Sequence, residues 1–320
     1  MRTVLVALSL LGAARLFAQT PEALRQLDYD QRAPLDLEET GTERRGGVSI
    51  HDISFVSPKG GRVPAYLVVP DGKGPFAAVL WGHWYWDNSD FRNRKEFLEE
   101  SVALAPAGVV SLMTDGPVAR PGHVEDKGPL NDHEITDLIQ AIVDMRRGAD
   151  LLLARTDIDP KRLAYVGHSY NASVGGFLSG LDRRFVAFVL MAGGLSDDSD
   201  LKTPEAQEYR KKVGPDEFDA FVAKYSWLDP GRFVSHAAPA EVFLQYGSQE
   251  KFLTPERARL YADRVSEPKR LKIYEAPHAL DAEARRDRIR FLTERLRLKP
   301  LDTAAIAKIP DLPQPPEPPR

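Results

Sequence analysis

The sequence contains no cysteine, and this absence excludes three kinds of chemistry at once. A chain without cysteine forms no disulfide, has no thiol nucleophile and cannot bind a metal ion through thiolates. The other metal-binding residue types are not clustered: His133 and Glu134 lack a second histidine at helical spacing, and no carboxylates have the spacing of a calcium-binding loop. A glycine-rich phosphate loop is also missing, so we expect neither a metal ion nor another cofactor.

Long apolar runs and an excess of basic residues are missing as well. A membrane-spanning helix needs ~20 consecutive apolar residues, and no such run occurs in the sequence. The formal net charge is -4, which gives no basic surface for nucleic acid. We therefore expect no membrane span and no nucleic-acid partner. The 320 residues, 42% of them hydrophobic, suffice for one large α/β domain.

The two ends of the chain differ from its middle. Arg2 is followed by a short apolar segment, and Ala18 is a small residue directly before Gln19. This pattern predicts a signal peptide over residues 1–18 and export to the periplasm or the medium, although Arg15 is unusual there and a buried first helix is the alternative. At the other end, proline-rich residues 299–320 predict a solvated tail, because proline lacks the amide hydrogen that helices and central strands need.

Between the ends, strand patterns alternate with helix patterns. Residues 48–56 and 62–70 alternate apolar and polar side chains, which predicts two antiparallel strands, and residues 76–81 form a continuous apolar run typical of a strand buried on both faces. Further strands are predicted at 109–114, 163–166, 185–191, 241–246 and 270–274, and helices at 93–107, 132–153, 205–212, 216–224, 255–265 and 281–298. Such alternation predicts a mostly parallel sheet with helices on both faces.

One domain accounts for this pattern. We expect it to span residues 48–298, with residues 19–47 as an extension lying over it. Residues 194–238 are polar and interrupt the rhythm of strands and helices. They are predicted to form a small helical cap over the active site.

A candidate nucleophile lies in the segment from Gly167 to Asn171. Ser169 follows the predicted strand at 163–166 and precedes a run of small residues that predicts a helix start. A serine on a tight turn between strand and helix is typical of the nucleophile elbow, G-x-S-x-G, in which small neighbours allow the close approach of strand and helix. Here Asn171 replaces the second glycine, and a turn without a catalytic role is the alternative.

A serine nucleophile needs a histidine base and an acid that orients it. Among seven histidines, His278 stands out because it follows the last predicted strand, at the edge of the sheet where ligands bind. The order nucleophile, acid, histidine leaves two places for the acid. Glu250 follows the strand before His278, whereas Asp197 and Asp198 follow the strand that ends at residue 191.

The segment after the strand at 76–81 is the candidate oxyanion loop. Two backbone amides are needed to hold the developing charge. We assign one to Tyr170, directly after the nucleophile, and the other to His83, with Trp84 as the alternative. Trp84, Tyr85 and Trp86 follow one another here and are interpreted either as an apolar wall for the substrate or as core residues.

Together these features resemble the α/β-hydrolase superfamily, and within it the dienelactone hydrolase-like and prolyl oligopeptidase-like serine hydrolases. The resemblance covers residues 48–298. It is most specific at residues 167–169, at the turn from Gly247 to Glu250 and at the loop 277–280. Because the turn at Gly247 resembles the acid turn of these hydrolases, the resemblance favours Glu250 over the two aspartates.

The sequence departs from the superfamily pattern at four positions. Ser169 stands where dienelactone hydrolases proper have cysteine, which argues against that substrate. Asn171 replaces a glycine, Trp81 stands where many relatives have histidine, and Glu250 stands where aspartate is usual. None of these changes removes the chemistry.

The resemblance implies an α/β-hydrolase fold and an exported serine hydrolase. We expect it to cleave a small-molecule or carbohydrate carboxylic ester through an acyl-enzyme, with Ser169 as nucleophile, His278 as base and Glu250 as acid. A serine peptidase is a second hypothesis, although no propeller or other gating domain is present. A non-catalytic binding protein on a hydrolase scaffold is a third, motivated by Asn171 and the altered oxyanion loop.

Overall fold

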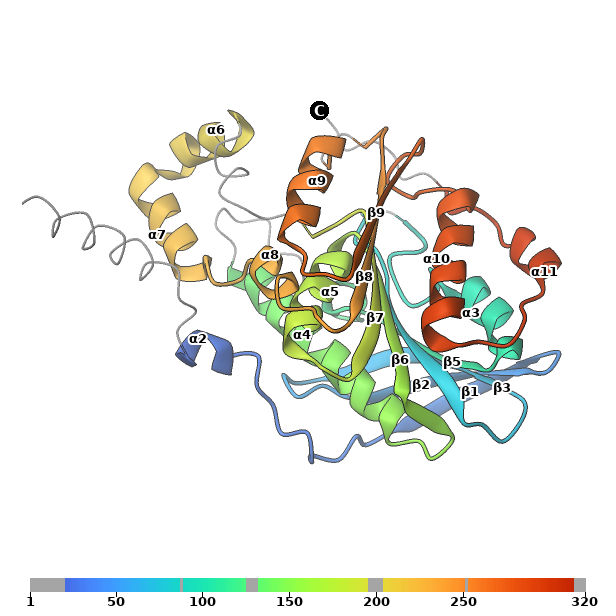
Figure 1. Cartoon of the computed structure of the whole chain (residues 1–320). Helices are drawn as coiled ribbons and strands as arrows, with labels where there is room; N and C mark the ends of the chain where they lie inside the picture. The colour runs from blue at the N-terminus through green and yellow to red at the C-terminus, as the bar shows by residue number, and fades with distance from the viewer. Residues whose placement is uncertain (1–20, 87–88, 125–131, 195–203, 251–252, 314–320) are drawn as a thin grey trace, which may run out of the picture.

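One mixed β-sheet organises the molecule. The computed structural model describes residues 21–86, 89–124, 132–194, 204–250 and 253–313. Its strands are β1 (Glu38–Arg45), β2 (Val48–Val56), β3 (Arg62–Pro70), β4 (Phe76–Gly82), β5 (Val109–Thr114), β6 (Ile158–His168), β7 (Phe185–Met191), β8 (Glu241–Gly247) and β9 (Lys269–Tyr274). Within the described residues, these nine strands form a single sheet in the order β1-β2-β3-β5-β4-β6-β7-β8-β9 (Figure 1).

The sheet is antiparallel at one side and parallel over the rest. β1, β2 and β3 pair antiparallel, as do β3 and β5. From β5 through β4 to β9 every neighbouring pair is parallel. The carboxyl ends of β4, β6, β8 and β9 therefore lie at one edge of the sheet, where ligands bind in open α/β sheets.

Helices cover both faces of this sheet. The helices in the described residues are α2 (Pro21–Arg25), α3 (Leu98–Leu104), α4 (Asp132–Leu153), α5 (Tyr170–Leu181), α6 (Pro204–Val213), α7 (Pro215–Tyr225), α8 (Pro230–Val234), α9 (Pro255–Arg264), α10 (Ala282–Leu296) and α11 (Thr303–Ala307), with short 3-10 turns at Ala105–Ala107 and Pro117–Ala119. Helices α4, α5, α8 and α9 lie on one face, and α3, α10 and α11 on the other (Figure 1). The predicted layered α/β arrangement is thus confirmed.

Each face has its own apolar core, and the central strands contribute to both. Along β6, Tyr165 packs into the core under α4 and α5, whereas its neighbour Val166 packs into the core under α10. Phe188 and Val189 of β7 divide in the same way. This division explains the continuous apolar runs in the sequence, because both faces of a central strand are buried.

Residues 21–47, the described part of the segment before the predicted domain, contain a strand and residues buried in the core. Strand β1 pairs with β2 over residues 38–45 and is almost entirely exposed. Ahead of it, Ala23 and Leu27 are buried in the core under α4. The sequence did not predict β1, because an exposed edge strand is held by its backbone hydrogen bonds and needs no apolar face.

The region predicted as a cap divides into two parts. Helices α6 and α7 project beyond the sheet (Figure 1), and α7 is tied to the start of α4 by a 2.6 Å hydrogen bond from the Tyr225 hydroxyl to Asp132. In contrast, α8 belongs to the body of the domain, because Phe233 is buried and packs 4.9 Å from Phe177 of α5. The segment 194–238 predicted as a cap thus includes a helix that packs with the domain. Whether α6 and α7 cover the active site stays a prediction.

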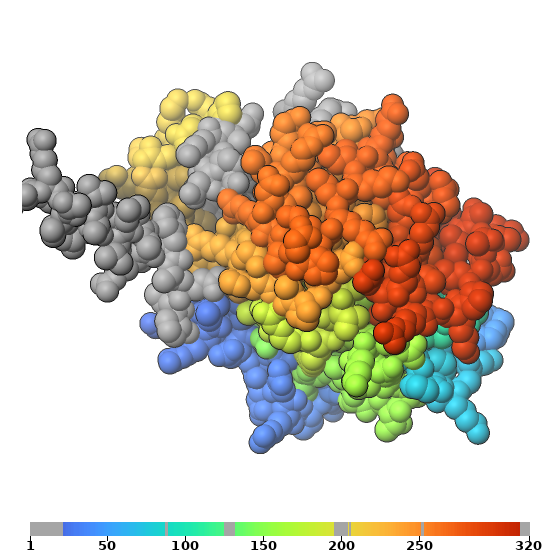
Figure 2. Space-filling view, in the orientation of Figure 1, coloured from blue at the N-terminus to red at the C-terminus, as the bar shows by residue number. Residues whose placement is uncertain are grey.

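Residues 299–313, the described part of the C-terminal segment, lie against the domain. They contain the short helix α11 within the predicted tail, and Ile306 of this helix is buried beside α10. Figure 2 shows the C-terminal segments, in orange and red, over the upper part of one face of the molecule, and the N-terminal segments, in blue, below them. Across the described ranges, no helix combines the length and apolar character that crossing a bilayer requires.

Candidate active site

Ser169 occupies a strained turn between β6 and α5. Its φ of 54° and ψ of -114° lie in a region that side chains other than glycine rarely adopt. The Ser169 amide donates a 2.7 Å hydrogen bond to the carbonyl of Met191, which ties the turn to β7. Gly167 is required here, since a Cβ at this position would lie 2.2 Å from the carbonyl oxygen of Asn171.

Asn171 has a structural reason to replace the second glycine of the elbow. Its side-chain amide donates a 2.6 Å hydrogen bond to the carbonyl of His83, so it connects the elbow to the loop after β4. Gly82 makes room for it, because a Cβ on Gly82 would lie 2.6 Å from the Asn171 Cβ. The departure from the usual motif is therefore accommodated by a glycine on the neighbouring strand.

His278 and Glu250 form a buried pair. The Nδ1 atom of His278 is hydrogen-bonded to a carboxylate oxygen of Glu250, and the two side chains are only 11% and 3% exposed. The other ring nitrogen of His278, Nε2, is buried and has no hydrogen-bond partner among the described residues. A carboxylate on Nδ1 fixes the tautomer that leaves Nε2 able to accept a proton.

The loops that carry these two residues are joined by backbone hydrogen bonds. The Ser248 amide donates to the carbonyl of Tyr274 over 2.8 Å, and the Gln249 amide donates to the carbonyl of Ala276 over 3.1 Å. Gly247 allows this approach, because a Cβ there would lie 2.1 Å from the Ala276 oxygen. The acid turn after β8 and the histidine loop after β9 thus form one unit.

Among the described residues, the two predicted oxyanion donors have no hydrogen-bond partner, whereas the alternative donor has one. No hydrogen bond from the His83 or Tyr170 amide is found in the described part of the chain. The Trp84 amide instead donates to Glu96 over 2.5 Å, so Trp84 is unsuitable as the second donor. Tyr170 begins α5, where the first amides of a helix have no partner within the helix.

The His83 side chain holds the loop from inside. Its Nδ1 donates to the carbonyl of Trp84 over 2.6 Å, and its Nε2 accepts from the Gly116 amide over 2.9 Å. One nitrogen donates and the other accepts, so the ring is neutral. Burial of the ring lowers the pKa of His83 below its ordinary value, in agreement with this tautomer.

The three aromatic residues after His83 differ in exposure. Trp84 is fully buried and stacks against His168 with ring centroids 5.2 Å apart, so it packs inside the protein and offers no exposed wall to a substrate. Tyr85 and Trp86 are half-buried. Tyr85 contacts Tyr170, and Trp86 lies 5.2 Å from the ring of His278. Substrate contact stays a prediction for these two residues.

Neither a protein-family model nor a curated protein sequence matches this chain. Solved structures do. Acetyl xylan esterase 1 from Thermoanaerobacterium sp. JW/SL YS485 has a TM-score of 0.69 at 18% identity, covering 85% of this chain and 91% of that one. Acetyl xylan esterase from Paenibacillus sp. R4 has a TM-score of 0.68 at 17% identity, covering 88% of this chain and 98% of that one. Glucuronoyl esterase from Solibacter usitatus has a TM-score of 0.58 at 14% identity, covering 88% of this chain and 96% of that one.

The chain has the α/β-hydrolase fold. The order and direction of its strands therefore give each loop a known place in the sheet. Ser169 follows β6, Glu250 follows β8 and His278 follows β9, all at the carboxyl edge. The competing acids, Asp197 and Asp198, lie outside the described residues.

Two residues beside the candidate site were not identified from the sequence. Glu96 lies in the turn before α3, and its carboxylate reaches both the Trp84 amide and the ring of His168. His168 was interpreted only as part of the elbow, yet its Nε2 contacts the carbonyl of His278 over 2.9 Å. No sequence signal identifies Glu96, because its partners lie 12 and 72 residues away.

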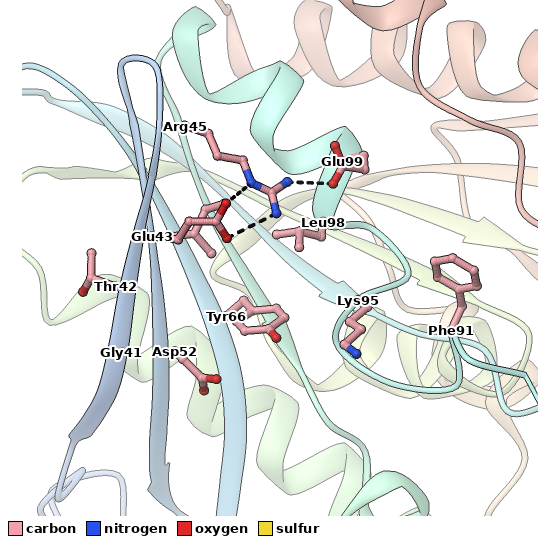
Figure 3. Close-up of a pocket in the computed structure, with 11 residues that line it drawn as sticks. Gly41, Thr42, Glu43, Arg45, Asp52, Tyr66, Phe91, Lys95, Leu98 and Glu99 are labelled. Carbon is pink, nitrogen blue, oxygen red and sulfur yellow. Dashed lines mark hydrogen bonds and ion pairs between the residues drawn. The ribbon is translucent and has the colours of Figure 1, made fainter.

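A separate cavity of about 560 Å³ lies between β1, β2, β3 and the segment before α3 (Figure 3). Tyr66 and Lys95 line it, and Arg45 bonds to Glu43 and Glu99 at one end. Its lining contains none of the three predicted triad residues, so we do not assign the reaction to it. In the ranges that the structure describes, no three histidine, aspartate or glutamate side chains are grouped to hold a metal ion.

Proposed function

We propose that the protein is a serine hydrolase that cleaves carboxylic esters through an acyl-enzyme. The observation that carries this proposal is the buried pair of Glu250 and His278, in which Nε2 of His278 has no hydrogen-bond partner among the described residues. This pair lies at the same edge of the sheet as the strained Ser169. Ser169 itself is only partly exposed. A nucleophile on a strained turn, an oriented base and two amides without a hydrogen-bond partner among the described residues are the parts that acyl transfer needs.

In the proposed reaction, the Ser169 hydroxyl attacks the ester carbonyl while Nε2 of His278 takes its proton. Glu250 keeps the ring in the required tautomer and stabilises the imidazolium that forms. The amides of His83 and Tyr170 hold the negative oxygen of the tetrahedral intermediate. His278 then protonates the leaving alcohol, and a water molecule, activated by the same ring, releases the acid from Ser169.

Carbohydrate esters are the substrate class that we propose. Two of the similar structures are acetyl xylan esterases and one is a glucuronoyl esterase. Tyr85 and Trp86 offer half-buried aromatic surface close to Tyr170 and His278, which suits contact with a sugar ring or a short acyl chain.

A panel of esters tests the substrate class directly. Purified protein is assayed against acetylated xylan fragments, a glucuronoyl ester and p-nitrophenyl esters of increasing chain length, with Ser169→Ala as the control. We expect turnover of the acetylated carbohydrate and of the short p-nitrophenyl ester, and none by Ser169→Ala above the oxyanion-hole background of ~10³–10⁴ over water. Turnover of peptides but not esters would instead support the peptidase hypothesis.

A further inference from the structure

A second carboxylate–histidine pair adjoins the proposed triad. Glu96 and His168 are joined by a 2.6 Å hydrogen bond between Oε1 and Nδ1, and both side chains are completely buried. His168 is the last residue of β6, directly before Ser169. The proposed reaction does not use this pair, and burying such a pair is costly unless its remaining hydrogen-bonding atoms are satisfied.

The remaining atoms of this pair reach two different loops of the site. The second carboxylate oxygen of Glu96 accepts the Trp84 amide over 2.5 Å. On the other side, Nε2 of His168 contacts the carbonyl of His278 over 2.9 Å. A carbonyl only accepts, so Nε2 carries a proton and donates it. The hydrogen bond between Nδ1 and Glu96 needs a further proton, which the ring and the carboxylate share.

Ring stacking adds a second connection among the same residues. The ring of His168 stacks against Trp84 at 5.2 Å and against His278 at 5.3 Å. The rings of Trp84 and His278 are themselves 6.3 Å apart and nearly parallel, at 13°. Displacement of His168 would therefore move the oxyanion loop and the base together.

We propose that Glu96 is a positioning residue: its one carboxylate fixes both the oxyanion loop, through the Trp84 amide, and the catalytic histidine loop, through His168. Occupying the Trp84 amide orients the loop so that the His83 amide remains as the donor. The hydrogen bond from His168 to the His278 carbonyl fixes the position of the His278 backbone, and with it the position of the base relative to Ser169. This inference rests on the proposed function, because it concerns how that site is held.

Glu100 provides a matched control. It is also a buried glutamate, four residues further along, and it forms a 2.6 Å ion pair with Arg288 of α10. Glu100 contacts none of the loops of the proposed site through the hydrogen bonds found here in the described residues. Glu100 lies in α3, directly after the turn that contains Glu96. Its replacement therefore reports the stability cost of losing a nearby buried glutamate without disturbing the proposed site.

Three substitutions at residue 96 separate position from charge. Glu96→Gln keeps the length: its amide oxygen can accept the Trp84 amide, and its NH₂ can donate to Nδ1 of a neutral His168. Glu96→Asp keeps the charge but withdraws the carboxylate by one methylene. Glu96→Ala removes both bonds. We measure kcat and KM for a p-nitrophenyl ester, and we follow unfolding of each variant beside Glu100→Ala.

If Glu96 acts by holding the two loops in position, kcat should be highest in Glu96→Gln, lower in Glu96→Asp and lowest in Glu96→Ala. We expect Glu96→Gln within about fivefold of the wild type and Glu96→Ala lower by about 10², the loss typical of a misplaced reacting group or oxyanion donor, with KM little changed. Glu100→Ala should lower the unfolding midpoint but leave kcat within about threefold.

Three results would overturn the proposal. These are a folded Glu96→Ala enzyme with kcat near the wild type, a Glu96→Asp enzyme that outperforms Glu96→Gln, and a Glu100→Ala enzyme as impaired as Glu96→Ala. If Glu96→Ala does not fold, the kcat of Glu96→Gln compared with that of Glu96→Asp still tests the proposal.

Nitrogen-15 NMR of the histidine rings tests the same inference without turnover. In the wild type and in Glu96→Gln we expect the His168 Nε2 proton to be protected from exchange, and in Glu96→Asp to be lost or to exchange rapidly. Equal protection in all three would contradict the proposal. An inactive wild type that shows this pattern would refute the proposed function alone.

Discussion

Glu250 orients the base His278 in the proposed chemistry and stabilises its charged form. Glu250→Gln keeps the size of the side chain but removes the charge that stabilises the imidazolium of His278, and its amide can favour the wrong tautomer. We expect kcat to fall by about 10²–10⁴ with little change in KM. The measurement is steady-state ester hydrolysis by the variant and by Glu275→Gln, an exposed glutamate three residues before His278 that serves as the control.

Removal of charge at Asp197 or Asp198 is the complementary test. These aspartates are the other candidates for the acid, and their substitution by asparagine should have a small effect. A severe loss of kcat in either variant, together with a mild effect of Glu250→Gln, would transfer the role of the acid to the loop after β7.

Asn171 gives a second prediction at the level of one side chain. Asn171→Gly restores the usual elbow motif, but it removes the hydrogen bond that holds the carbonyl of His83. A buried carbonyl left without its donor costs about 1–3 kcal/mol, so we expect urea unfolding to show a loss of stability of this size. We also expect lower rather than higher kcat, because the oxyanion loop loses a support. Higher activity in Asn171→Gly would contradict this account of the substitution.

The loop after β4 is held by a titratable group, which makes its stability depend on pH. His83 must be neutral to accept the Gly116 amide, which follows β5, and burial lowers its pKa. In the unfolded chain a histidine has a pKa of about 6.5. Below that pH the unfolded state binds more protons than the folded state, so this contribution to stability is complete above about pH 6.5 and falls as the pH decreases.

Unfolding of the wild type and of His83→Asn at two pH values tests this dependence. The stability advantage of the wild type should be smaller at pH 5.5 than at pH 7.5, by up to about 1.4 kcal/mol, because asparagine does not titrate. An advantage that is equal at both pH values would show that His83 titrates in the folded state as it does in the unfolded chain.

The strands of the parallel part of the sheet could be predicted from sequence, and the reason is their burial. β5 and β7 coincide with predicted runs because every or almost every residue is buried. β1 was missed since its residues are charged and exposed, and α8 was missed because five residues give no periodicity. The predicted helix at 93–107 is shorter in the structure, where α3 spans Leu98–Leu104.

Some residues of the candidate site could likewise be predicted from the local sequence, whereas others depend on contacts between distant segments. Ser169, His278 and Glu250 could be selected because each follows a recognisable strand in a fixed order. Glu96 could not, since its proposed role depends on contacts with the loop after β4 and with the end of β6, which only the folded chain brings together. The sequence already assigned the second oxyanion donor to the His83 amide, with Trp84 as the alternative. The hydrogen bond from the Trp84 amide to Glu96, which argues against that alternative, exists only in the folded chain.

At the level of the whole protein, export is the prediction that concerns the chain ends. Residues 1–18 lie outside the described residues, so the signal peptide stays a sequence-based prediction. N-terminal sequencing of protein recovered from the native host should give a mature chain that begins at Gln19. Recovery of the full chain from the cytoplasm, with Met1 retained, would contradict export.

Covalent labelling of the intact protein tests the central proposal most directly. A fluorophosphonate reacts with a serine only where a base, an acid and an oxyanion hole activate it. We predict one label per chain, located on Ser169 by peptide mass spectrometry, absent from Ser169→Ala and formed much more slowly in Glu250→Gln. A folded wild type that takes up no label, or carries it on another residue, would contradict the assignment of Ser169, His278 and Glu250 as a catalytic triad.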